Sequence, residues 1–237
     1  MRGHGEMADL LARYGARGDL PVLDTVEQFV RACLRMDGRR VREMIENHRE
    51  LLTDSRAIQR AIELDRDDVV GMLLDLDMSP DLEDQAHGNH RPLHAAGAHG
   101  ATKRARLLIA RGADVDARDS TYQGTPLTWA AHFGHRDMVE LLGRYARDVW
   151  HLTYTGRVDR LREVLHEEPE RARVVSSDGW TPLMWLPDDE GAALEITTLF
   201  LDHGANPAQR NHEGETAADI AEQRGMSDVV KRLRSTF

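Results

Sequence analysis

The chain has 237 residues, a formal net charge of −10 at pH 7 and an aromatic content of only 5%. This acidic balance argues against a general nucleic-acid binder, which needs clustered cations to displace the counterions of phosphates. The single cysteine, Cys33, excludes an internal disulfide. No apolar run suits a signal peptide or approaches the ~18 residues of a membrane helix. We therefore expect a cytoplasmic protein that binds neither nucleic acid nor membrane.

Helix signals begin near the N-terminus with one predicted helix, followed by two helix pairs. Residues 7–20 favour a single helix that ends at Gly15, because leucines precede this glycine at helical spacing. Residues 22–51 and 53–86 each favour two helices, joined in the second pair by a turn at Asp65. The single helix either caps the helix pairs or indicates that the chain was cut from a longer series of pairs, and both interpretations stay open.

Charges in this region are distributed unevenly. Residues 54–84 contain ten acidic residues and three arginines. A basic stretch with Lys103, Arg104, Arg106 and Arg111 follows. Solvated helix faces explain this distribution most simply, and an interaction with a basic patch on a partner is the alternative.

Two segments in the middle of the chain share one sequence pattern. Arg91–Ala96 reads R-P-L-H-A-A, and Thr125–Ala131 reads T-P-L-T-W-A-A. The proline suits the first turn of a helix, where a missing N–H needs no partner, and Thr125 can cap that turn. We expect Gly134 to end this helix with a positive φ.

Three further copies of the pattern follow. Residues 148–175 form a degenerate copy that begins without a loop, because Tyr145, Ala146 and Arg147 lead directly into its first helix. Gly179–Leu183 then reads G-W-T-P-L, and Gly214–Ala218 reads G-E-T-A-A. We expect Thr181 to cap a helix as Thr125 does, and Gly225 to end the first helix of the last copy.

This recurring pattern resembles the ankyrin repeat. The family's T-P-L-H-x-A-A signature corresponds to Arg91–Ala96 and Thr125–Ala131, and its G-A-D-V-x-A loop corresponds to Gly112–Ala117. The resemblance implies an all-α ankyrin-repeat solenoid of stacked helix-turn-helix pairs with short β-hairpin-like loops, which spans residues 1–237 as a single domain. After the half-repeat at residues 7–20, the expected repeats are 22–51, 53–86, 87–119, 120–147, 148–175, 176–210 and 211–235. The preference for arginine over lysine is compatible with a GC-rich, bacterial genome.

The sequence contains no recognisable catalytic or metal-binding motif. His87, His90, His94 and His99 have a spacing that metal ligands can use. However, the first two fall in a loop, and the third holds the place of the ankyrin histidine that hydrogen-bonds the turn. Cys33 lacks a fixed histidine partner and matches a small core position. We expect no catalytic residue, no metal and no cofactor.

Aromatic residues mark the predicted binding surface. By analogy with the family, Trp129, His132 and Phe133 lie on or near the concave side of a first helix, where a partner can bind them. Packing between repeats is the alternative. Tyr122 and Trp180 lead into first helices, and an extra residue is expected to push Tyr122 outward. The predicted partner-binding residues are Leu64, His99, Tyr122, Trp129, His132, Phe133, Tyr154, Trp180, Asp188 and Asp189.

The two aspartates in this set belong to a short carboxylate group. Asp188, Asp189 and Glu190 follow Pro187, which is expected to break the first helix of residues 176–210. A solvated loop is the simplest interpretation of this group, and a contact with a partner is the alternative.

The resemblance implies a non-catalytic scaffold that binds a protein partner, as yet unidentified, through the concave groove and hairpin tips. We expect a monomer whose binding surface spans about residues 87–155. One alternative is a targeting or regulatory domain of a larger multi-domain protein. A remote alternative is an enzyme with an unrecognised site in the groove, which would require a cluster of perturbed acids or histidines there.

Overall fold

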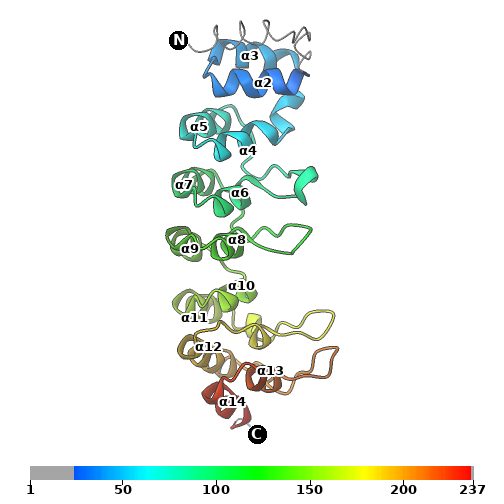
Figure 1. The fold of residues 1–237 in the computed structure, drawn as a ribbon, viewed down its shortest axis with the longest axis vertical. Coiled ribbons are helices and arrows are strands. Elements are labelled where there is room, and N and C mark those ends of the chain that lie inside the picture. The colour runs from blue at the N-terminus through cyan, green and yellow to red at the C-terminus, as the bar shows by residue number, and fades with distance from the viewer. Residues whose placement is uncertain (1–23, 236–237) are drawn as a thin grey trace, which may run out of the picture.

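The computed structural model describes residues 24–235, which form one stack of helix pairs (Figure 1). The predicted half-repeat at residues 7–20 lies outside the described residues. The α-helices are α2 (Thr25–Leu34), α3 (Gly38–Asn47), α4 (Arg56–Glu63), α5 (Asp67–Asp75), α6 (Pro92–Ala98), α7 (Thr102–Ala110), α8 (Pro126–His132), α9 (Arg136–Gly143), α10 (Val149–Tyr154), α11 (Val158–Glu167), α12 (Glu190–Asp202), α13 (Ala217–Gln223) and α14 (Ser227–Arg234). The 3-10 helices are η1 (Arg49–Thr53), η2 (Gln85–His87), η3 (Pro169–Arg173) and η4 (Pro182–Met184).

The helices pack in two parallel columns. In the first column α2, α4, α6 and α8 contact one another in series, and in the second α5, α7 and α9 do the same. Loops project from one side of the stack (Figure 1), and residues 24–235 contain no β-strand. The predicted all-α ankyrin-type solenoid is therefore confirmed. The exact repeat boundaries stay predictions.

Short turns join the two helices of each pair. Gly134 and Gly225 end α8 and α13 with φ of 74° and 75°, as predicted. Met36 and Asp65 adopt the same left-handed conformation after α2 and α4, although both carry a Cβ. At the other end of α8, the hydroxyl of Thr125 accepts a hydrogen bond from the amide of Thr128. Local backbone chemistry therefore fixes where these helices begin and end.

The interface between α6 and α8 is the most extensive helix contact in the described part of the chain. Leu93 of α6 and Leu127 of α8 are both fully buried. Gly97 allows the two helices to approach, because a Cβ at this position would lie 2.6 Å from the carbonyl oxygen of Pro126. Small residues therefore produce close apolar packing here.

The loops resemble hairpins through their hydrogen bonds. The amide of Asp84 donates to the carbonyl of His90 at 2.8 Å, which forms an isolated antiparallel bridge. Neighbouring loops are also joined, since the amide of Ser120 donates to the carbonyl of Gly88 at 2.9 Å. The loops thus form a second line of contact between adjacent layers.

The acidic stretch and the basic stretch meet on the second column, between α5 and α7. Arg104 of α7 forms ion pairs with Asp65 and Asp67. Two turns further along, Arg111 pairs with Asp75 at 2.6 Å. Much of the uneven charge in the sequence is therefore used between α5 and α7, which supports its interpretation as a feature of the helix faces.

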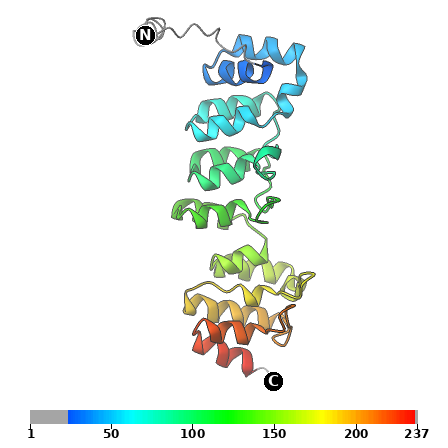
Figure 2. The ribbon, with the colours of Figure 1, turned by 45° about the vertical axis from the view of Figure 1, so that its right-hand side comes forward.

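The stack changes character between α9 and α10. No helix before this point packs extensively against a helix after it, and Figure 2 shows the α10/α11 pair displaced sideways from the α8/α9 pair. Besides the buried Ala146 and Val149, polar bonds cross the junction. The amide of Arg147 donates to Asp116 Oδ2 at 2.8 Å, and Arg157 donates to both carboxylate oxygens of Glu140 at 2.6 and 2.9 Å. The absence of a hairpin-like loop before α10, expected from the sequence, coincides with this break.

Two local expectations for residues 176–210 are wrong. Thr181 makes no capping hydrogen bond, and only the single turn η4 follows it. Glu190 is the first residue of α12 instead of part of a solvated loop. The physical reason is Pro187, which has no amide hydrogen and disfavours a helical conformation at the residue before it. The chain therefore leaves η4 early and starts a new helix after the proline.

Candidate binding groove

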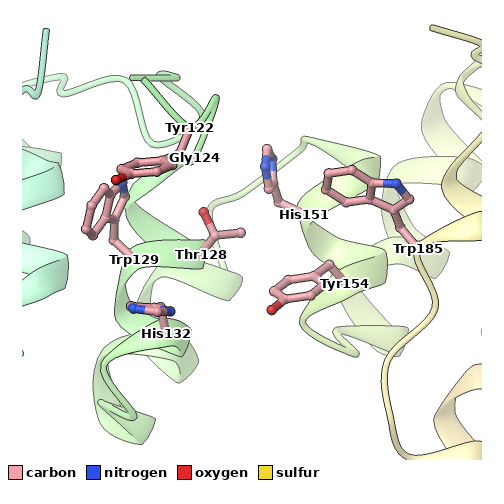
Figure 3. A pocket seen from close by; sticks show the side chains of 8 residues that line it. All are labelled: Tyr122, Gly124, Thr128, Trp129, His132, His151, Tyr154 and Trp185. Carbon is pink, nitrogen blue, oxygen red and sulfur yellow. The ribbon is translucent and has the colours of Figure 1, made fainter. Parts of the chain in front are cut away.

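A groove lies across the junction between α8 and α10 (Figure 3). Its volume is about 450 Å³, and a second hollow of about 620 Å³ continues from it toward Asp188 and Arg224. The first part is lined by Tyr122, Gly124, Thr128, Trp129, His132, His151, Tyr154 and Trp185. Since α8 and α10 do not pack closely, the side chains on either side of the gap face open space.

One wall of the groove is built around Trp129. Its ring stacks on Phe133 with centroids 5.9 Å apart and meets Tyr122 edge-on, also at 5.9 Å. His90 approaches the indole from the preceding loop, with ring centroids 4.7 Å apart. Aromatic pairs at these separations stabilise one another, so the wall is a cohesive aromatic cluster.

A buried carboxylate fixes the orientation of this wall. Trp129 Nε1 donates to Asp119 Oδ2 at 2.9 Å, and the amides of Tyr122 and Thr121 donate to Oδ1 at 2.6 and 2.9 Å. Burial alone would raise the pKa of Asp119, but these hydrogen bonds outweigh it and hold the pKa below its ordinary value. The carboxylate is therefore ionised at neutral pH.

The opposite wall comes from α10 and the segment around η4. The centroid of the Trp185 ring lies 6.4 Å from that of Tyr154 and 6.1 Å from that of Trp150, with interplanar angles of 68° and 82°. His151 is buried behind them, with Nδ1 3.2 Å from Asp148 Oδ1. Figure 3 shows Tyr154 and Trp185 across the groove from Tyr122 and Trp129.

Trp185 and Trp150 were not among the predicted site residues. A signal for Trp185 was present, because it follows Thr181-Pro182-Leu183 at the same place that Trp129 follows Thr125-Pro126-Leu127. The shared register puts both indoles toward the concave side. For Trp150 no comparable signal exists, since its repeat is degenerate.

Comparison with known proteins agrees with this architecture. Residues 41–153 match the family model described as ankyrin repeats in three copies. Residues 41–153 are ankyrin repeats, and the described stack has the ankyrin-repeat fold. An ankyrin repeat domain from Acinetobacter baumannii AYE is similar in structure, with a TM-score of 0.55 and 23% sequence identity. The match covers 77% of this chain and 98% of that domain, and at this identity it shows the fold alone. Ankyrin repeats are generally protein-interaction scaffolds and typically not enzymes.

The predicted site residues occupy several different places in the ankyrin array. Trp129, His132, Tyr154 and Tyr122 line the groove, and Phe133 packs on its first wall. The outward position expected for Tyr122 is confirmed, since 74% of its surface is exposed.

Four other predicted residues lie outside the first part of the groove. Leu64 and His99 are exposed at the ends of α4 and α6, as Phe133 is at the end of α8. Trp180 is half-buried beside His212, with ring centroids 6.3 Å apart. Asp188 borders the second hollow, where its carboxylate pairs with Arg224 at 2.7 Å.

Asp189 has a structural role in the array. Its carboxylate accepts a hydrogen bond of 2.7 Å from the amide of Ala192 and so caps α12. An aspartate at this position also interacts favourably with the positive end of the helix. This capping role explains why an aspartate is found at position 189 without a contact to a partner.

His94 of α6 and His90 of the preceding loop serve the fold in the same way. His94 Nδ1 accepts a hydrogen bond from the amide of Arg91 at 3.1 Å, and Nε2 lies 3.2 Å from the carbonyl of Gly124. Burial lowers the pKa of His94 to about 4, so its ring is neutral at pH 7 and Nε2 can donate. His90 stacks on it, with centroids 5.5 Å apart. Within residues 24–235, no cluster of histidine, cysteine or acidic side chains is arranged to hold a metal ion.

Cys33 is enclosed between α2 and its neighbours. Its side chain is fully buried, and burial raises the pKa of the thiol to about 12. The thiolate that nucleophilic chemistry requires therefore does not form at neutral pH. Across the same described residues, the helices are too short or too polar to cross a bilayer.

Proposed function

We propose that this protein is a non-catalytic scaffold that binds a protein partner through its concave face, with the groove between α8 and α10 at the centre of the surface. It acts without a cofactor, as a monomer in the cytoplasm. The hairpin tips and the exposed ends of α4 and α6, with Leu64 and His99, extend the surface toward the N-terminus. Trp180 extends it in the other direction.

The observation that carries this proposal is a concentration of exposed rings. Tyr122, Phe133, Tyr154 and Trp185 are 74%, 51%, 52% and 43% exposed, and all four border or support one groove. Covering apolar surface contributes roughly 25 cal/mol per Å². Tyrosine and tryptophan are also enriched among the residues that dominate binding energies. A partner that covers these rings would remove their apolar surface from water, which stabilises the complex.

The groove is better suited to recognition than to catalysis. Asp119 uses its oxygens to bind backbone amides and an indole, and the most perturbed histidine, His94, is buried in hydrogen bonds between loops. Neither group faces a space where it could exchange a proton with a substrate. We therefore favour binding over an enzymatic role.

The test compares groove variants with a matched control on the same protein. Phe133→Ala and Tyr122→Ala should leave helical circular dichroism unchanged, because both side chains are largely exposed. Tyr145→Ala is the control, since Tyr145 is 49% exposed and lies outside the groove. Proteins captured by the wild type and by the control, but not by the groove variants, are identified by mass spectrometry. Equal capture by all four forms would show that the partner binds elsewhere.

A further inference from the structure

The carboxylate behind the first wall of the groove has no counter-charge. Asp119 is fully buried, and no lysine or arginine within residues 24–235 forms an ion pair with it. The neighbouring carboxylate at the junction differs in this respect, because Asp148 is paired with Arg118 and lies beside His151. The hydrogen bonds that stabilise the charge of Asp119 come from backbone amides and one indole, and His90 is the ionisable side chain that interacts with it electrostatically.

This charge acts on the surface of the groove through Trp129. The indole N–H donates directly to the carboxylate at 2.9 Å, and hydrogen bonds of this kind polarise the donor. Electron density is displaced toward the ring, which makes the negative face of the indole a better acceptor for a cation. The neighbouring tyrosine is held by the same carboxylate, through its amide at 2.6 Å.

The second wall provides aromatic faces without fixed charge. Tyr154 and Trp185 meet edge-on, with an interplanar angle of 68°, and none of the eight residues that line the first part of the groove is a lysine, arginine, aspartate or glutamate. The lining therefore carries no permanently charged side chain, and its two basic side chains are the histidines His132 and His151. Arg224, which lines the second hollow, is engaged by Asp188. The volume of about 450 Å³ is enough for a long side chain.

We propose that the groove binds an arginine side chain of the partner, with its guanidinium between the Tyr122/Trp129 wall and the Tyr154/Trp185 wall. This inference rests on the proposed function and names the chemistry of its partner. Arginine fits better than lysine because its planar guanidinium stacks on aromatic rings and is more weakly hydrated. An uncharged proline-rich or aliphatic segment would cover the rings but would bring no positive charge near the carboxylate of Asp119.

A library of random peptides displayed on phage tests the proposal. Selection uses the wild-type chain, and peptides that bind equally well to Tyr154→Ala are removed. Tyr145→Ala serves as the matched control, because the two tyrosines are 52% and 49% exposed. We expect the remaining peptides to share an arginine. Replacing that arginine by citrulline, which keeps the shape and removes the charge, should weaken binding about fivefold to thirtyfold by isothermal titration calorimetry.

The outcomes separate the two proposals. Groove-dependent peptides that lack arginine, or that bind as tightly with citrulline or lysine in its place, would overturn the arginine inference and leave protein recognition by the groove intact. A selection that yields no peptide sensitive to Tyr154→Ala would count against both.

Discussion

Two interfaces of similar position in the stack are built in opposite ways. Between α6 and α8, glycine and alanine allow helices to approach and bury leucines, so the layers are joined by apolar packing. Between α8 and α10, the helices contact each other little. The apolar core continues through Ala146 and Val149, and ion pairs and backbone hydrogen bonds also join the layers. In a repeat array each layer is stabilised only by its neighbours. The contrast therefore predicts two blocks, residues 24–143 and 148–235, that are stable within themselves and weakly coupled.

The largest expected effect comes from breaking the apolar interface. Leu127→Ala should cost about 2 to 5 kcal/mol, because it removes a fully buried side chain and leaves a cavity. If the junction couples the blocks weakly, faster amide exchange should be confined to the block that contains α6–α9. Hydrogen exchange followed by mass spectrometry measures this.

A mirror variant controls for this result. Leu165→Ala removes an equally buried leucine from α11, and it should accelerate exchange only in the block from α10 to α14. If either substitution accelerates exchange along the whole chain, the junction couples its neighbours as strongly as the α6–α8 interface, and the contrast is wrong.

Acid should weaken the first block before the second. His94 has its pKa lowered to about 4 by burial, whereas the unfolded chain titrates near the ordinary value of 6.5. As the pH falls from 6.5 to 4, the unfolded state takes up a proton that the native state does not, so stability decreases by as much as about 3 kcal/mol. The loss is absent above pH 6.5.

The junction carboxylate behaves differently in the same window. Burial would raise the pKa of Asp148, but His151 and Arg118 outweigh this effect and hold it far below the ordinary value. It therefore stays ionised in this range. Protection factors, which correct for the intrinsic pH dependence of amide exchange, should decrease between pH 7 and pH 5 more in α6 and α8 than in α10 and α11. Equal decreases in both regions would argue against His94 as the source.

The sequence predicted the first interface better than the second. Repeated T-P-L signatures and turn glycines act locally, so helix positions and the stacking of α6 on α8 follow from residue types at fixed spacing. The groove depends on the distance between α8 and α10, which results from a missing loop and from side chains far apart in sequence. Trp185 has the same place after Thr181-Pro182-Leu183 as Trp129 has in its repeat, but its contacts in the groove depend on the path of the chain after η4, which Pro187 diverts.

The same contrast between local signals and long-range packing explains which features of the site the sequence could indicate. Tyr122 could be placed outward from one extra residue in its loop, a local feature. Asp119 could not be recognised as the anchor of Trp129, because its four hydrogen bonds depend on the detailed path of the 119–124 loop. Sequence reasoning therefore found the exposed rings of the first wall and missed the charge behind them.

The smallest expected effect concerns the polar bonds of the junction. Glu140→Gln breaks the two-oxygen ion pair with Arg157, whose partners are largely or partly exposed. Such pairs contribute roughly 0 to 1 kcal/mol and are weakened by salt. The global free energy of unfolding should hardly change. Amide exchange in one block should depend still less on the stability of the other block, and the difference from the wild type should be largest at low ionic strength, where the ion pair is strongest.

Asp75→Asn is the matched control, since it breaks the Arg111 pair between α5 and α7, where apolar packing continues. If the control uncouples its layers as much as Glu140→Gln does, ion pairs join all layers alike, and the junction owes its weakness to something other than sparse helix packing.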